Sequence, residues 1–154
     1  MIERNKAVPA SHLILEHEGK VLLARRCNTG YQDGNYQFPA GHVDAGELPM
    51  DAMVREAQEE IGITIDRENL TLVHMIYRTR RDVTGDRVDL FFAASVWAGE
   101  VTNMEPNKCD DLLWVEPDVL PENTLPVCRI ALDGRRDNKI FTEMSAEQLA
   151  ACGL

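Results

Sequence analysis

The segment PMDAMVREAQEEIG, residues 49–62, constrains the fold most strongly because it carries the start, stop and periodicity signals of one helix. Proline suits the first turn of a helix, and glycine suits the position just past its end. At about 100° per residue, five apolar side chains fall within roughly 60° of the first of them. They are Met50, Met53, Val54, Ala57 and Ile61. The sequence therefore predicts a helix over residues 49–61 with one face on a core.

Three glutamates, Glu56, Glu59 and Glu60, lie within an arc of about 100° beside that apolar stripe. Like charges at this spacing destabilise a helix by about 0.2–0.5 kcal/mol per pair, so something must offset their repulsion. A solvated acidic face is one interpretation. The other is a metal site, because Arg55 precedes Glu59 by four residues and the glycine-rich loop before the helix adds Glu47. Carboxylates and a loop carbonyl are hard oxygen donors suited to Mg²⁺ or Mn²⁺.

The remaining segments mix strand-like and helix-like patterns. Strands are predicted at residues 11–26 (two strands around a Glu18-Gly19 turn), 70–78, 87–97 and 112–115. Ser145 begins a last helix, because Gln148 three residues later completes a capping box. The segment 120–126 contains two prolines, which predict an irregular connection between secondary-structure elements. This mixture indicates an α+β fold or an α/β sandwich.

Length, composition and charge limit the class of protein. The 154 residues fit one domain, which we expect to span residues 1–154, and no apolar run approaches membrane-helix length. No signal peptide opens the chain, so a cytoplasmic location is expected. The net charge of −10 disfavours nucleic acid polymers and anionic membranes as partners. A small phosphorylated molecule can still bind if a divalent cation mediates the contact.

A longer pattern surrounds the glutamates. Gly41 is followed by five residues, Glu47, seven residues and then REAQEEIGI over residues 55–63. This pattern matches the Nudix box at all nine specified positions over 23 residues, two of them specified only as hydrophobic. The lead-in FPAGH also resembles that of the family, with Ala40 where glycine is often seen. The chain thus resembles Nudix hydrolases over about residues 10–125.

The resemblance implies the Nudix fold, a mixed β-sheet sandwiched between α-helices, and Mg²⁺-dependent hydrolysis of a nucleoside diphosphate linked to another group. Mn²⁺ is an expected substitute for Mg²⁺. By position, the implied metal ligands are the carbonyl of Gly41 and the carboxylates of Glu56, Glu59 and Glu60. The implied catalytic residues are Glu59, Glu56, Arg55 and Glu47. Arg55 is expected to orient a glutamate, and Glu47 to support the loop or the outer shell of the metal.

The general base stays open between a box glutamate and an acid outside the box. The segment EPNKCDD supplies three outside candidates, Glu105, Asp110 and Asp111, each of which is equally explained as an ordinary loop acid.

The EPNKC segment, with Trp114-Val115 beyond it, resembles the MutT-like branch, which takes nucleoside triphosphates. Arg25 and Arg26 end a strand just before a glycine-rich loop, where a guanidinium can clamp a terminal phosphate, although two solvated arginines explain them equally well. We therefore expect a small nucleotide substrate and a monomer or homodimer. The alternatives are an ADP-ribose or nucleotide-sugar pyrophosphatase and a non-catalytic nucleotide-binding module. Intact box carboxylates disfavour the second alternative.

Two further groups of residues are weaker candidates for substrate contact. A second cationic cluster, which a charged hairpin tip explains equally well, comprises Arg78, Arg80 and Arg81. Aromatic side chains that can stack on a base, but that packing explains better, are Tyr31, Tyr36, Tyr77 and Trp97.

Overall fold

The structure is a computed structural model that describes residues 1–80 and 83–154. In chain order its elements are β1 (Ala7–His17), β2 (Lys20–Arg26), β3 (Tyr36–Gln37), β4 (Ala40–His42), α1 (Pro49–Ile61), the 3₁₀ turn η1 (Arg67–Asn69), β5 (Thr71–Arg78), β6 (Asp86–Ala94), β7 (Cys109–Val115), α2 (Pro126–Arg136), β8 (Phe141–Met144) and α3 (Ala146–Ala151). Within the described residues the strands form one sheet in the order β3-β2-β1-β6-β5-β8, with β4 also paired to β1 and β7 to β2.

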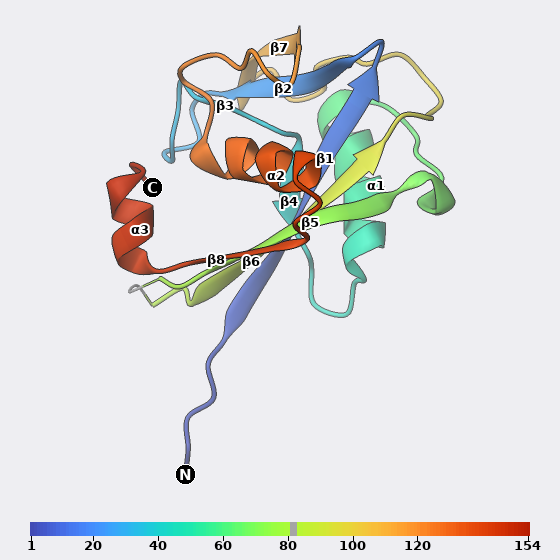
Figure 1. The fold of residues 1–154 in the computed structure, drawn as a ribbon. Helices are drawn as coiled ribbons and strands as arrows, with labels where there is room; N and C mark the ends of the chain where they lie inside the picture. Colours follow the sequence, from blue (N-terminus) through green and yellow to red (C-terminus); the bar gives the residue numbers. More distant parts are fainter. Residues whose placement is uncertain (81–82) are drawn as a thin grey trace.

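Strand β1 is the centre of this sheet (Figure 1). One edge pairs in parallel with β6 from Ala7 to Leu15, and the other pairs with β4 and, at its end, with β2. The β1–β2 hairpin turns where the sequence predicts, because Glu18 and Gly19 both have positive φ, at 50° and 75°. Most of β1 is buried, as expected of a strand covered on both faces.

Helices cover both faces of the sheet, which confirms the predicted α/β/α sandwich. Successive side chains of a strand point to opposite faces. Thus Ile14 packs in the core beneath α2, whereas Leu13 and Leu15 pack in the core beneath α1. Figure 1 shows α2 lying across one face of the sheet, with α1 on the other side.

Helix α1 forms at the predicted residues, Pro49 to Ile61. Met53, Ala57 and Ile61 are fully buried, and the rest of the predicted stripe packs against the same core. Gly62 ends the helix with φ of 69°, a left-handed conformation that glycine adopts without strain. The local signals in the sequence were therefore sufficient to define this element.

The sequence did not predict β3, β4, α2 or β8, and it misplaced three strand ends, the first being the start of β1 at Ala7 rather than residue 11. The buried stripe of α2 consists of Val127, Cys128, Ala131 and Gly134, so it carries little hydrophobic signal. Gly134 is required there because a Cβ would lie 2.4 Å from the His74 ring. Strand β6 ends at Ala94 rather than Trp97, and β7 begins at Cys109 rather than residue 112, because the neighbouring strands fix the paired length.

The C-terminal helix follows the predicted capping box. Ser145 accepts a hydrogen bond from the Gln148 backbone N–H, and the Gln148 side chain accepts one from the Ser145 N–H. Within the described residues, no helix has both the length and the apolar composition that a membrane span requires.

Candidate active site

The first part of the site is the contact between β4 and α1. The Ser11 hydroxyl of β1 donates to the Pro49 carbonyl at 2.7 Å and so ties the start of α1 to the sheet. Strand β4 lies beside this point, because Gly41 pairs with Ser11. The Glu56 side chain of α1 fills the space above Gly41, where a Cβ would lie 1.9 Å from Oε1. A glycine at this position lets a carboxylate reach the backbone of β4.

Arg55 organises the acidic side chains around this contact. Its Nε and Nη2 donate to the two carboxylate oxygens of Glu47 at 2.9 and 3.0 Å. Its Nη1 donates to Glu56 at 2.8 Å and to Glu59 at 3.3 Å. The His42 carbonyl accepts a further bond from Nη2 at 3.1 Å. Only a planar guanidinium presents enough donors in a fixed fork to hold these oxygens at once.

The electrostatics of the glutamates follow from these contacts. Hydrogen bonds from Arg55, with one from the Asp44 N–H, lower the pKa of Glu47 to about 2. Burial raises the pKa of Glu56 although the Arg55 guanidinium opposes the shift. Burial, with the nearby charge of Glu56, raises the pKa of Glu60 to about 8, although the Ala40 N–H donates to its carboxylate at 2.9 Å. Burial therefore disfavours the charged forms of Glu56 and Glu60, and a bound cation would favour them.

The carboxylates fit a hard divalent cation by their chemistry and by the open cleft that they line. One oxygen each of Glu56, Glu59 and Glu60 is used by Arg55 or Ala40, and the second forms no hydrogen bond within the described residues. As the side chains stand, no three acidic, histidine or cysteine groups among the described residues are arranged around one point. Mg²⁺ does not require such a cage, because it commonly binds one or two carboxylates together with waters and substrate phosphates.

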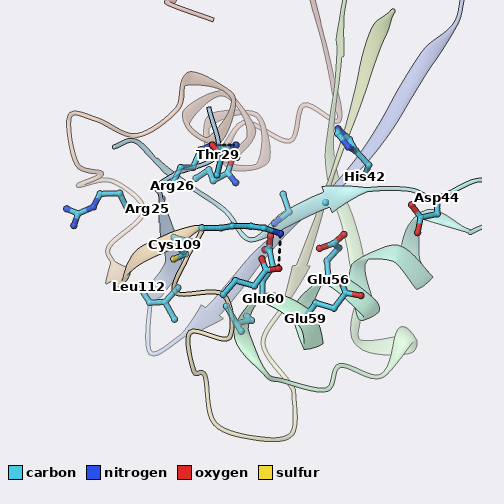
Figure 2. Close-up of a pocket in the computed structure, with 17 residues that line it drawn as sticks. Arg25, Arg26, Thr29, His42, Asp44, Glu56, Glu59, Glu60, Cys109 and Leu112 are labelled. Atoms are coloured by element: carbon cyan, nitrogen blue, oxygen red, sulfur yellow. Dashed lines mark hydrogen bonds and ion pairs between the residues drawn. The ribbon is translucent and has the colours of Figure 1, made fainter. Parts of the chain in front are cut away.

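A cleft of about 480 Å³ opens over these carboxylates (Figure 2). Its walls come from β2, β4, α1 and the segment before β7. The charged residues that line it are Arg25, Arg26, Asp44, Glu56, Glu59, Glu60, Glu105 and Lys108. The cleft thus has an acidic floor and cations on its rim, which suits a phosphate chain bridged by a metal.

The two predicted clamp arginines differ in their surroundings. Arg25 donates to Asp110 at 2.6 Å, and Figure 2 shows its side chain extending away from the glutamates. Arg26 donates to the Tyr31 carbonyl at 2.7 Å and to the Thr29 hydroxyl at 3.0 Å. Both line the cleft. Arg26 is the better candidate for binding a phosphate, because its guanidinium donates to neutral oxygens, whereas a carboxylate neutralises Arg25.

The three candidate general bases outside the box lie in different surroundings. Glu105 lines the cleft and is close enough to raise the pKa of Glu60. Asp110 pairs with Arg25, and Asp111 accepts a hydrogen bond from the Tyr36 hydroxyl. Neither aspartate lines the cleft. Glu105 is therefore the outside candidate that the geometry favours.

A second cavity of about 420 Å³ adjoins the cleft across β4 and gathers several weaker candidates. Tyr31, Arg78 and Arg80 line it, whereas Tyr36, Tyr77 and Trp97 line neither cavity. Arg81 lies outside the described residues. Sequence reasoning missed His12, Arg87 and Asp89, which also line this cavity. Asp89 carried one signal, a charge between the apolar residues Val88 and Leu90.

Comparison with known proteins decides the family. The NUDIX domain profile matches residues 5–130. The chain belongs to the Nudix family. An 8-oxo-dGTP diphosphatase from Proteus vulgaris is 30% identical over 66% of this chain and 88% of its own length. An RNA pyrophosphohydrolase from Erythrobacter litoralis is 26% identical over 78% of this chain and 82% of its own.

Solved structures agree with this assignment. The crystal structure of a MutT NUDIX hydrolase from Burkholderia pseudomallei superposes with a TM-score of 0.75 at 27% identity, covering 83% of this chain and 97% of the other. These relatives confirm the predicted Nudix membership and MutT-like branch. Nudix hydrolases generally use a divalent metal, and the named relatives of this one are nucleotide pyrophosphohydrolases.

The close approach of Glu56 to Gly41 gives a testable consequence for this Nudix site. The substitution Gly41→Ala should lower the free energy of unfolding by about 1–3 kcal/mol, the usual cost of overpacking, because the new methyl group must displace a carboxylate held by Arg55. Urea unfolding measures the loss. In a Glu56→Ala background the same glycine substitution should cost under about 0.5 kcal/mol, because the clash is gone. Equal losses in both backgrounds would show that Glu56 is not the group in the way.

Proposed function

We propose that this protein is a Mg²⁺-dependent pyrophosphohydrolase that cleaves a phosphoanhydride bond of a nucleoside triphosphate or a related nucleoside diphosphate derivative. The observation that carries the proposal is the cluster of Glu56, Glu59 and Glu60, held by Arg55 and Ala40 at the floor of a 480 Å³ cleft. Cationic side chains on the rim of the same cleft support a phosphorylated substrate.

The metal ligands we propose are the three cleft carboxylates and the carbonyl of Gly41. Bound there, Mg²⁺ or Mn²⁺ supplies neutralisation of phosphate oxygens and a water of lowered pKa. Arg55 would fix the carboxylate of Glu56 by its 2.8 Å bond, and Glu47 would hold the other side of that guanidinium. Burial of Glu60 supports this assignment, because a buried carboxylate near like charges is stabilised by a cation.

Glu105 is the proton acceptor that we propose outside the box. It lines the cleft next to the end of α1, where the Met104 N–H donates to the Glu60 carbonyl at 3.0 Å. Lys108 donates to the Glu105 carboxylate at 3.2 Å. Glu59 is the alternative within the box, because its side chain is half exposed and held by only one hydrogen bond to Arg55 in the described residues.

A small nucleotide fits this site better than a nucleic acid polymer. The chain carries a net charge of −10, which repels a long polyanion, whereas one phosphate chain can be held through metal and rim cations. The name of one relative, an 8-oxo-dGTP diphosphatase, supports a nucleoside triphosphate. We propose that the protein acts in the cytoplasm on this class of substrate, as a monomer or homodimer.

Removal of metal and of metal-binding charge tests the proposal. Excess EDTA should abolish release of phosphate or pyrophosphate from nucleotides, and Mg²⁺ or Mn²⁺ should restore it. Glu59→Gln and Glu60→Gln should each lower kcat by at least about 100-fold, because each loses the charge that binds a hard cation. Circular dichroism should show an intact fold. The exposed Glu122→Gln serves as the matched control and should keep full activity. Full turnover in chelator, or normal rates in both variants, would refute the proposal.

The rim arginines test the class of substrate. Nucleoside triphosphates should be cleaved to monophosphate and pyrophosphate with higher kcat/KM than ADP-ribose or nucleotide sugars. Arg26→Ala should weaken triphosphate turnover by about 1.5–3 kcal/mol, the value of a charge-assisted hydrogen bond, and should barely change turnover of a diphosphate sugar. Arg67→Ala, at an exposed arginine paired with Asp51, is the control. A preference for ADP-ribose, or equal losses on both substrates, would contradict this assignment.

A further inference from the structure

The second cavity is basic in a strongly acidic protein. It shares Arg26 and strand β4 with the cleft, so the two spaces lie on either side of the same strand. Its ionisable residues include Arg26, Arg78, Arg80, Arg87 and one carboxylate, Asp89. Four arginines facing one space are a quarter of the 16 basic residues of a chain whose net charge is −10. Such a concentration of cations indicates an anionic occupant.

Two of these arginines are fixed by neutral oxygens. Arg87 donates through Nη1 to the Gly85 carbonyl at 2.9 Å and through Nη2 to the Thr84 hydroxyl at 2.7 Å. Arg26 is held in the same way by a carbonyl and a hydroxyl. Neither forms an ion pair with a carboxylate in the described residues. Their guanidinium groups are therefore held in place before a ligand binds, and no carboxylate in the described part of the chain neutralises their positive charge.

The wall between β1 and β6 adds a buried polar group. Asp89 is almost fully buried, and it contacts Arg78 at 2.6 Å and the Nε2 of His12 at 2.9 Å. The His12 ring stacks on Phe91 with centroids 4.5 Å apart. Its Nδ1 is buried and has no hydrogen-bond partner within the described residues, although His12 lines the cavity. A buried nitrogen without a partner costs free energy unless a ligand or water satisfies it.

We propose that this cavity is a second phosphate-binding subsite, occupied by a phosphate group of the substrate other than those above the α1 carboxylates. The inference rests on the proposed function: the two cavities share Arg26 and β4 in their walls, and one substrate would occupy both. It narrows the substrate to nucleotides with a second phosphate group that can reach this cavity while another lies above the α1 carboxylates. The second phosphate comes either from the ribose, as a 3′-phosphate, or from the far end of a 5′-triphosphate chain.

Calorimetric binding in EDTA tests this subsite without turnover. The ligands are guanosine 5′-monophosphate, guanosine 3′,5′-bisphosphate and guanosine 5′-triphosphate. The wild-type protein should bind the bisphosphate or the triphosphate at least about tenfold more tightly than the monophosphate, and Arg87→Gln should remove that gain. The ligand that gains affinity identifies the source of the second phosphate. A gain for the bisphosphate indicates the ribose 3′-phosphate, and a gain for the triphosphate indicates the end of the 5′-phosphate chain. Arg67→Gln, which changes the same charge outside both cavities, should leave it unchanged.

A second charge-removing variant keeps the binding test interpretable if the first variant misfolds. Because Arg87 also holds the turn before β6, Arg80→Gln provides a second removal of charge if Arg87→Gln misfolds. No gain for either ligand, or a loss in the Arg87 and Arg80 variants that is equal for all three ligands, overturns the subsite. If hydrolysis depends on metal but the second phosphate adds no affinity, the subsite is refuted and the proposed function remains. A gain without hydrolysis keeps the subsite and removes the catalytic proposal.

Discussion

Arg55 is the interaction on which the arrangement of the site depends. Its guanidinium joins Glu47 from the loop, Glu56 and Glu59 from α1, and the His42 carbonyl from β4. Without this cation, three carboxylates on adjacent turns of one helix would repel each other and their neighbour Glu47. The guanidinium offsets part of that repulsion and leaves the cleft side of the carboxylates negative. A lysine could not replace it, because one ammonium cannot donate to four groups in fixed directions.

The division of charge across β4 follows from the sheet. On one side of Gly41 lie the α1 carboxylates, and on the other lie the arginines of β5 and β6. The parallel pairing of β1 with β6 places His12 directly beside Phe91 and close to Asp89. A narrow strand with glycine at its centre thus separates an acidic space from a basic one. The ligand that we propose for this arrangement carries both a metal-bound and a directly bound phosphate.

The sequence predicted the elements whose signals are local. Helix α1, its cap at Gly62 and the glutamates on its face all lie within residues 41–63, so spacing alone relates them. The α3 capping box is equally local. Helix α2 escaped prediction because its buried stripe ends in Gly134, which only the His74 ring on β5 explains. The second cavity escaped for the same physical reason: His12 and Asp89 are 77 residues apart in the chain and meet only through strand pairing.

If the carboxylates of Glu56, Glu59 and Glu60 form a divalent metal site, Mn²⁺ binding followed by electron paramagnetic resonance tests that site most directly. The signal of free Mn²⁺ should fall when wild-type protein is added, and Mg²⁺ should restore it by competition. The combined variant Glu56→Gln, Glu59→Gln and Glu60→Gln should leave the Mn²⁺ free at the same protein concentration. Equal Mn²⁺ binding by the wild type and by a folded triple variant would contradict the account.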